Sequence, residues 1–327
     1  IKGSKPGKTV ALRADMDALP VTELTGLPFA SKNEGVMHAC GHDGHMSILL
    51  GAAAVLNEMK DKLHGTVKIV FQPAEEEAAI GGGRHIAASG KLDDVSEIYG
   101  LHVWPELPTG QVGLKPGALM AASDRFYVHI KGKSTHAAQR HTGTDALVAA
   151  AHFIIDVQSL ISREMNPMDN VVCTIGLMNA GTRYNVGVED AYLEGTCRTY
   201  RPELRDKMEA RLGEILKGLD VMFHTHSELN YVRGHSATIN TPEKIDFLQN
   251  VGKAYLGEEH ITEPEFPSRC AEDFASYLEK FPGAFFWLGT GDGNTPALHN
   301  ASFAINESIL PLGITLEAAA ALEALSR

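Results

Sequence analysis

The chain has 327 residues, of which 44% are hydrophobic and 21% are charged, a composition typical of soluble globular proteins. This length is large for one hydrophobic core and suits two domains. The formal net charge of −12 argues against nucleic acid as a partner, because phosphates are bound through Lys and Arg. No apolar run approaches the roughly 20 residues of a membrane helix, and no signal-peptide pattern opens the chain, so no membrane partner is expected.

Cysteine and histidine are the informative residue types. The four cysteines (Cys40, Cys173, Cys197 and Cys270) are far apart and are interpreted as reduced thiols of a cytoplasmic protein. The 15 histidines are unusual, because His is the commonest ligand of transition metals. The chain opens without Met on residues that resemble the middle of a hairpin, so we expect N-terminal residues to be missing.

Strands alternate with helices over about the first hundred residues. Strands are predicted at residues 9–13, 67–71 and 98–103, and a short helix follows the glycines at 81–83. Residues 45–60 are predicted as an amphipathic helix, because apolar side chains recur there at helical spacing. This alternation predicts an α/β domain with a mixed sheet flanked by helices, in which ligands gather beyond the strand ends.

The order of elements changes after Pro116 and predicts a second domain. The predicted series is strand 125–131, helix 145–163, strands 170–178 and 191–200, helix 202–219 and strand 221–232. This β-α-β-β-α-β order is the ferredoxin-like arrangement. Residues 117–233 are therefore predicted to be inserted into a first domain formed by residues 1–116 and 234–327. The returning part carries a helix after Pro242, a helix from Glu272, strand 285–288 and a final helix from Leu316.

The densest group of chemically active side chains is the segment 38–45, His-Ala-Cys-Gly-His-Asp-Gly-His. Cys40 and His42 can aim at one point if the segment is a turn, and Gly41 and Gly44 permit such a backbone. A helix that begins nearby would lower the pKa of a thiol through its N-terminal potential. The alternative is a histidine-rich turn that binds no metal.

Three further candidates follow predicted strands or lie in them. Glu75 and Glu76 come directly after a strand, where one carboxylate can bind metal while its neighbour acts as a general base; a solvated acidic helix start is the plainer explanation. His102 lies among apolar strand residues, where a hydrogen-bonded core histidine is common. His299 lies in a glycine-rich loop. With Cys40 and His42, these ligands are too many for one four-coordinate site and suit two ions.

These segments resemble the aminoacylase/carboxypeptidase family of dinuclear metallohydrolases, in the amidohydrolase branch related to hippurate hydrolase and the indole-acetyl-amino-acid hydrolases. The matching stretches span the whole chain in order: residues 12–20, 37–45, 71–76, 100–104, 134–138 and 298–300. The resemblance implies five metal ligands, Cys40, His42, Glu76, His102 and His299. It implies that Glu75 is the general base and that Asp17 lies behind the ligands rather than among them.

The resemblance also implies roles for the inserted domain as a lid and a homodimer interface. His136 is similar to a lid histidine that reaches the partner's active site and stabilises the oxyanion. Asn185 and Arg198 are similar to residues that hold the substrate carboxylate, a task that suits the guanidinium fork. Plain structural roles for all three stay open. After His299 the sequence departs from the family pattern, which concerns substrate fit more than metal binding, and the family's leading elements are absent.

The sequence thus predicts metal-dependent hydrolysis of the amide bond of N-acyl amino acids, small molecules such as hippurate or N-acetyl amino acids. Two divalent ions are expected as cofactors, and the mixed Cys, His and Glu ligands accept zinc, manganese, cobalt or nickel. A dipeptidase or carboxypeptidase on the same scaffold is an alternative. An inactive metal-binding homologue, or a hydrolase that uses Cys40 as its nucleophile, is a further one.

Overall fold

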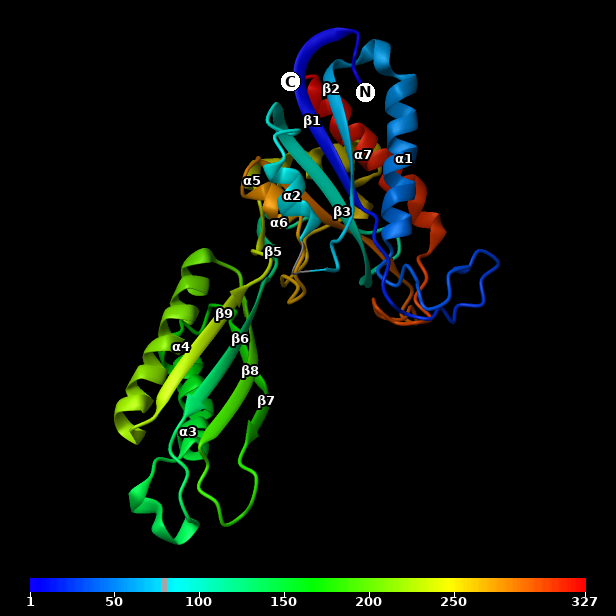
Figure 1. Ribbon diagram of the computed structural model, residues 1–327. Helices are drawn as coiled ribbons and strands as arrows, with labels where there is room; N and C mark the ends of the chain where they lie inside the picture. Colours follow the sequence, from blue (N-terminus) through cyan, green and yellow to red (C-terminus); the bar gives the residue numbers. More distant parts are fainter. Residues whose placement is uncertain (78–80) are drawn as a thin grey trace. The chain divides into compact units, whose positions relative to one another are not determined.

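The computed structural model describes residues 1–77 and 81–327, and it divides them into two compact units (Figure 1). The first unit comprises Ile1–Leu119, Thr238–Ser268 and Glu272–Arg327. The second unit comprises Met120–Ala237 and Arg269–Ala271. The short stretch Arg269–Ala271 therefore belongs to the second unit, although it was predicted in the first domain. The sequence pattern missed it because the other residues of that unit lie far from it along the chain.

A six-stranded sheet forms the centre of the first unit. Its order is β11-β4-β12-β3-β1-β2, and β1 pairs in parallel with both β2 and β3, while β12 pairs in parallel with β3. The strands are β1 (Lys5–Asp15), β2 (His64–Gln72), β3 (Val95–Pro108), β4 (Val112–Gly113), β11 (Ile261–Thr262) and β12 (Gly283–Gly291). Because β1, β2, β3 and β12 run the same way, their carboxyl ends lie at one edge of the sheet, where the loops after them meet.

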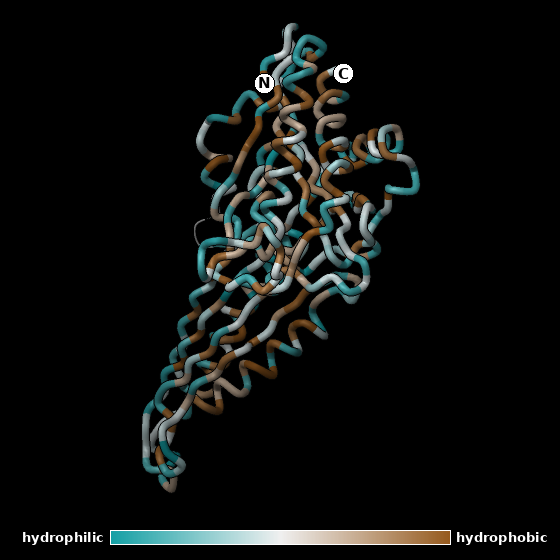
Figure 2. Tube along the Cα trace, turned by 90° about the vertical axis from the view of Figure 1, so that its right-hand side faces the viewer, coloured by the Kyte–Doolittle hydropathy of each residue, from teal (hydrophilic) through white to brown (hydrophobic). Residues whose placement is uncertain are grey.

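Helices cover this sheet and complete its core. The helix α1 packs against α7, and α7 packs against α5 and β1, while the shorter α2 and α6 pack on each other. Figure 2 shows the hydrophobic stretch of the C-terminal helix α7, whose buried face is rich in alanine. The helices are α1 (His42–Glu58), α2 (Gly82–Ala88), α5 (Pro242–Tyr255), α6 (Ala275–Leu278) and α7 (Leu310–Leu325).

The second unit is a four-stranded antiparallel sheet with two helices. The sheet order is β7-β8-β6-β9, and the helices α3 and α4 pack on each other and on the strands. Its core is built from one face of each helix and the inward side chains of the strands, such as Phe126, Phe153 and Leu193. In chain order the elements are β6 (Ala122–Lys131), α3 (Ala146–Ser159), β7 (Val172–Ala180), β8 (Asp190–Thr199), α4 (Pro202–Phe223) and β9 (His226–Arg233).

Short elements complete the described chain. They are the 3-10 turns Lys60–Lys62, Ala137–Thr142, Glu258–His260 and Glu307–Ile309, the π-turn Leu160–Glu164, and the paired strands β5 (Gly117–Met120) and β10 (Thr238–Asn240).

Several predicted element bounds are wrong, among them the following three. Residues 221–223 end α4 instead of opening a strand, because the amphipathic repeat of this helix continues through them despite the β-branched Val221. The helix predicted from Glu272 is only the short α6, which begins at Ala275. The final helix begins at Leu310, six residues before the predicted start, because Pro311 is compatible with a first helical turn.

Two helices meet the length and hydropathy of a membrane span, contrary to the expectation that no apolar run approaches that length. They are Ala146–Glu164 and Glu307–Leu325, with mean hydropathies of 1.3 and 1.5. About a third of the first window and 56% of the second are buried within the protein. Core helices of globular units pass the same test, so this feature alone is weak evidence for a membrane.

Candidate metal centre

The turn that carries Cys40 and His42 depends on Gly41. This glycine precedes α1 in the left-handed conformation, with φ of 84°. A Cβ atom on it would lie 2.4 Å from Val103 Cγ2, so a larger residue would also collide with β3. The turn therefore presents both Cys40 and His42 at the start of α1, beside the carboxyl edge of the sheet.

Cys40, His42 and Glu76 form the first group of donors. One ligating atom from each lies within 4.8 Å of the other two, and Cys40 and His42 are buried. The other two predicted ligands adjoin this group: Cys40 Sγ lies 3.4 Å from His102 Nε2, and Glu76 Oε1 lies 3.1 Å from His299 Nε2. The structure thus brings all five predicted ligands into one continuous cluster.

The donor atoms of this cluster fit divalent ions. His42 Nε2 and Glu76 Oε1 are buried and have no hydrogen-bond partner among the described residues. Buried polar atoms without a partner are uncommon, and coordination of an ion would satisfy these two. A thiolate, imidazoles and a carboxylate together suit transition metals. In the absence of an ion, burial raises the pKa of the Cys40 thiol well above its ordinary value, and the carboxylates of Glu76 and Glu75 raise it further.

Backbone contacts orient two of the histidines. His42 Nδ1 donates to the carbonyl oxygen of Asp17 at 3.0 Å, and His102 Nδ1 donates to the carbonyl of Val103 at 2.6 Å. In each ring this leaves Nε2 facing the cluster, as in metal sites where the second ring nitrogen is fixed by an outer partner. Asp17 also accepts a hydrogen bond from the backbone N–H of Glu76 at 2.9 Å, so it ties two ligand segments together.

The loop of His299 is held by strained and hydrogen-bonded backbone. His299 has a φ of 66°, which is unusual for a residue with a side chain. Its N–H donates to the carbonyl of Ala39 at 2.8 Å, which ties this late loop to the Cys40 turn. Such strain is often found at functional sites, where the surrounding structure maintains it.

Sequence reasoning missed a buried group behind the ligands. Asp15, His42, His45 and His102 also offer donor atoms within 4.8 Å of one another. Both nitrogens of His45 are already engaged, because Nδ1 donates to Asp15 Oδ1 at 2.6 Å and Nε2 accepts from Val103 N–H at 2.9 Å. His45 and Asp15 therefore form a support for the cluster rather than a further free donor set. The acidic Asp15, shortly after the predicted strand 9–13, is the one sequence signal that pointed toward this group.

Glu75 lies in a second buried group with Glu272 and Asp273, which sequence reasoning also missed. One carboxyl oxygen from each lies within 4.8 Å of the others, and all three residues are buried. Burial raises the pKa of Glu75 well above its ordinary value, and the carboxyls of Glu272 and Asp273 add to this. Arg13 is the neighbouring cation, with Nη2 at 2.8 Å from Asp273 and 3.0 Å from Glu272.

The three remaining predicted site residues, His136, Asn185 and Arg198, belong to the second unit. His136 is exposed, and its Nδ1 accepts from Ala138 N–H at 3.1 Å. Asn185 lies beside it, because Ala137 N–H donates to the Asn185 carbonyl, while the buried Oδ1 of Asn185 has no hydrogen-bond partner among the described residues. Arg198 lies on β8 and donates to Thr196 Oγ1 and to the Cys197 carbonyl.

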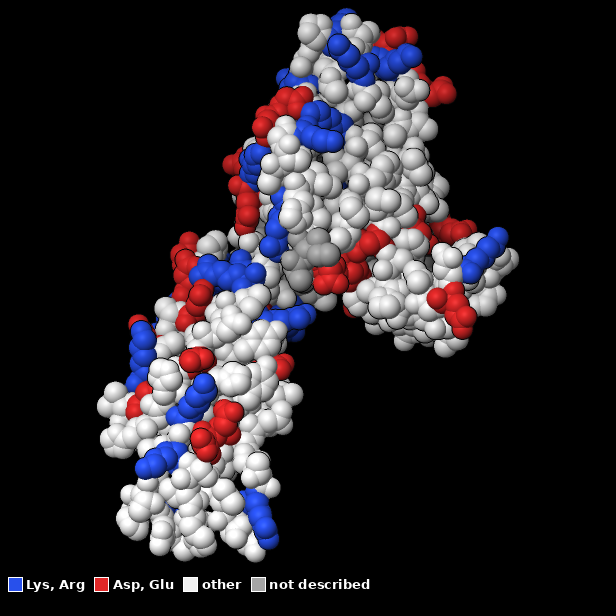
Figure 3. Space-filling view, viewed as in Figure 1, with Lys and Arg blue, Asp and Glu red and all other residues white. Residues whose placement is uncertain are grey.

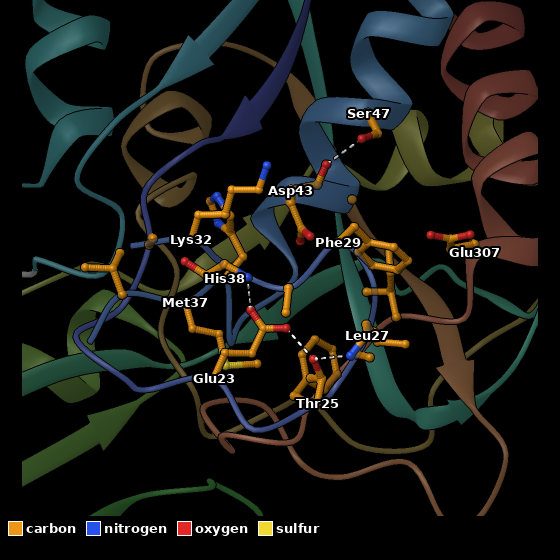
Figure 4. Close-up of a pocket in the computed structure, with 18 of the residues that line it drawn as sticks. Glu23, Thr25, Leu27, Phe29, Lys32, Met37, His38, Asp43, Ser47 and Glu307 are labelled. Carbon is orange, nitrogen blue, oxygen red and sulfur yellow. Dashed lines mark hydrogen bonds between the residues drawn. The ribbon is translucent and has the colours of Figure 1, made fainter. Parts of the chain in front are cut away.

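A pocket of about 580 Å³ lies in the first unit beside the Cys40 turn (Figure 4). Acidic and apolar side chains line it, among them Glu23, Phe29, Asp43 and Glu307, and none of the predicted ligands does. On the face of the described residues drawn in Figure 3, basic side chains are interspersed with acidic ones.

Comparison with known proteins places the chain in a family. Residues 11–323 match the family described as Peptidase family M20/M25/M40. The chain is 40% identical over 310 residues to the N-acetyl-L-cysteine deacetylase of Bacillus subtilis, covering 95% of this chain and 73% of that protein. It is 41% identical over 326 residues to the N-acetyldiaminopimelate deacetylase of Listeria innocua, covering 96% and 83%.

Solved structures agree with this assignment. The YXEP protein of Bacillus subtilis, described as a dinuclear metal binding peptidase from the M20 family, is 36% identical to the chain. Its structure superimposes with a TM-score of 0.87 over 100% of this chain and 84% of that one. The chain therefore belongs to the peptidase family M20/M25/M40.

Proposed function

We propose that this protein is a dinuclear metal-dependent amidohydrolase that cleaves the amide bond of N-acyl amino acids. The observation that carries the proposal is the cluster of Cys, His and Glu donors, with Cys40, His42 and His102 buried and a second glutamate, Glu75, next in the chain to Glu76. The names of the deacetylase relatives support the substrate class. The proposed ligands of the two ions are Cys40, His42, Glu76, His102 and His299.

Glu75 is the proposed general base. Divalent ions at this site would acidify water and polarise the scissile carbonyl. Glu75 takes a proton from the attacking water and returns it to the leaving nitrogen. Its burial supports this role, because burial raises the pKa of Glu75 and so favours its uptake of a proton from the attacking water. Asp17 holds His42 and the backbone of Glu76 in place.

The second unit is the proposed lid and dimerisation domain, with a ferredoxin-like fold. The chain order β6-α3-β7-β8-α4-β9 and the sheet order β7-β8-β6-β9 support that fold. His136 is the proposed oxyanion-stabilising residue, and Asn185 and Arg198 are proposed to hold the substrate carboxylate. The unpartnered Asn185 Oδ1 supports a role for that side chain in binding. The largely exposed edge strand β7 supports a pairing surface between two copies.

The identity of the ions and the cellular compartment are also proposals. Zinc, manganese, cobalt and nickel all accept this donor set, so availability decides among them. The four cysteines form no disulfide with one another, which supports the reducing cytoplasm as the proposed compartment.

The deciding experiment is a substrate panel with controlled metal content. N-acetyl-cysteine, N-acetyl-methionine and hippurate would be compared with unblocked dipeptides, using metal-free protein, protein reloaded with each candidate ion, and the Glu75→Gln variant. Release of free amino acid that depends on metal and is lost in the variant supports the proposal. Preference for dipeptides would instead support a dipeptidase. Failure of every reloaded preparation on every substrate would overturn the hydrolytic assignment.

A further inference from the structure

The carboxyl group of Glu272 is hydrogen-bonded on one side only. Glu272 is 1% exposed. Its Oε1 accepts from the Phe274 N–H at 2.9 Å and lies 3.0 Å from Arg13 Nη2. Its Oε2 is buried and has no hydrogen-bond partner among the described residues. A buried oxygen of this kind is costly unless a donor or a proton serves it.

The neighbouring carboxyls leave Glu75 as the partner of that oxygen. Asp273 is saturated, because it accepts from Arg13 Nη2, from Gln72 Nε2 and from the Gly83 N–H at 2.7 to 2.8 Å. Glu75 is also buried, and one of its carboxyl oxygens lies within 4.8 Å of a carboxyl oxygen of each of these two acids. Because Asp273 is already engaged, Glu75 is the carboxyl in this group that can accept a hydrogen from Glu272 Oε2.

We propose that Glu272 is a positioning residue for Glu75, and that its neutral carboxyl donates a hydrogen bond from Oε2 to the Glu75 carboxylate. The inference rests on the proposed function, in which Glu75 is the general base. With Oε1 fixed by Arg13 and the Phe274 N–H, Oε2 has one direction available, so the donated hydrogen bond would hold Glu75 in a single orientation. Fixing a catalytic group in this way contributes to rate through orientation rather than through substrate binding.

Burial and the acidic neighbours of Glu272 favour its neutral form. The charged groups that face it are Arg13, Asp15, Glu75 and Asp273. Burial is the largest effect and raises the pKa of Glu272, Asp15 and Asp273 raise it further, and Arg13 opposes them, with a result of about 8. Arg13 is already paired with three carboxylates, those of Asp15, Glu272 and Asp273. A full negative charge on Glu272 in addition to that on Glu75 would therefore be poorly compensated.

The test compares a substitution that preserves the donated hydrogen bond with one that abolishes it. In Glu272→Gln the amide oxygen can still accept from Arg13 and Phe274, while the amide N–H₂ takes the place of Oε2 and donates to Glu75. We expect its kcat at pH 7 to stay within about threefold of the unmodified protein. In Glu272→Leu we expect kcat to fall by roughly 30-fold or more, with KM changed less than about threefold and the same metal content.

One outcome of this comparison overturns the inference. If Glu272→Gln is folded, binds its ions and loses as much kcat as Glu272→Leu, then Glu272 acts through its charge and not as a neutral donor. Thermal melting shows whether Glu272→Leu is folded; if it is not, the Glu272→Gln result decides alone. If the unmodified protein hydrolyses nothing, the proposed function has failed separately.

A measurement without turnover tests the neutral carboxyl directly. A buried acid whose folded pKa is raised above its unfolded value stabilises the fold below the unfolded pKa, and that stability is lost as the pH rises through the folded pKa. We therefore expect the free energy of unfolding of metal-free Glu272→Gln, measured in urea, to increase relative to that of the unmodified protein as the pH rises from 5 to 9. A difference that is constant across this range would show that Glu272 is ionised throughout, and would overturn the inference.

Discussion

His299 Nε2 lies 3.1 Å from Glu76 Oε1, although the two residues come from opposite halves of the first unit's chain. The same carboxylate oxygen lies 3.9 Å from His42 Nε2. Glu76 is therefore the point at which the early turn and the late loop of the candidate metal centre meet. The neighbouring Glu76 carboxylate raises the pKa of His299, although partial burial of the ring opposes it.

Removal of the His299 ring tests whether this loop supplies a ligand. We expect His299→Ala to lose one of two bound ions and about 100-fold or more in kcat. The reason is that the remaining donors no longer suffice to coordinate the second ion. Metal analysis after gel filtration measures the first effect, and hydrolysis of N-acetyl-cysteine the second. His38→Ala is the matched control, because His38 lines the neighbouring pocket. Retention of both ions in His299→Ala would contradict the assignment.

Metal affinity is expected to increase with pH because of Cys40. Burial and the nearby carboxylates keep the thiol protonated in the metal-free protein, so binding must release its proton. For one proton the apparent affinity rises about tenfold per pH unit, as competition with a chelator between pH 6.5 and 7.5 would show. Iodoacetamide should fail to label Cys40 while metal is bound but should label the exposed Cys270. Rapid labelling of Cys40 in metal-loaded protein would refute its role as a ligand.

The metal-free protein should be more stable at pH 6 than at pH 9.5 because of His42. Burial lowers the pKa of His42, but Asp15, Asp17 and Glu76 outweigh it and raise the pKa to about 9. A histidine whose pKa is raised in the folded state stabilises the fold fully below its unfolded pKa of about 6.5. This contribution is lost as the pH rises through 9. The contribution is at most roughly 3 kcal/mol.

Urea unfolding of metal-free protein at the two pH values measures this effect. The difference between the unmodified protein and His42→Asn isolates it from the other titrating groups. If the two proteins lose equal stability between pH 6 and pH 9.5, the charged form of His42 makes no contribution to the fold.

Gly41 should tolerate no side chain. Gly41→Ala places a methyl group against Val103 Cγ2 and forces a left-handed conformation on alanine, so we expect a loss of about 1–3 kcal/mol of stability and weaker metal binding. Thermal melting and metal titration measure the two effects. Gly26→Ala is the matched control, because Gly26 also has positive φ but no atom lies within 4 Å of the position that its Cβ would take. Equal losses in the two variants would show that backbone strain alone, and not the contact with β3, matters.

Cys40, His42 and Glu76 could be proposed as ligands from the sequence because they lie in short motifs directly after a predicted strand or at a helix start. Cys40 and His42 flank a glycine, and Glu75 and Glu76 follow β2 directly. The support behind them could not be predicted in this way. Arg13 lies among apolar strand residues, and its partners Glu272 and Asp273 are about 260 positions away, so only the folded sheet brings them together.

Element bounds were predictable where a periodic pattern ended at a turn residue. The end of α4 was missed, since Val221 and Phe223 have strand propensity in isolation, yet they continue a helix that is already packed on the sheet of the second unit. The domain prediction rested on element order, whereas the place of Arg269–Ala271 in the second unit depends on long-range packing that no local pattern encodes.

The position of β12 between β3 and β4 has a consequence for biosynthesis. Both neighbours of β12 are translated early, and the whole of the second unit is translated before β12 itself. A nascent chain that has reached the second unit therefore exposes the open edge of β3, a state in which unpaired strands invite wrong association. His299 follows β12 and is translated later still, so uptake of ions by the complete ligand set must wait until the ribosome has made both units and the central strand that closes the sheet.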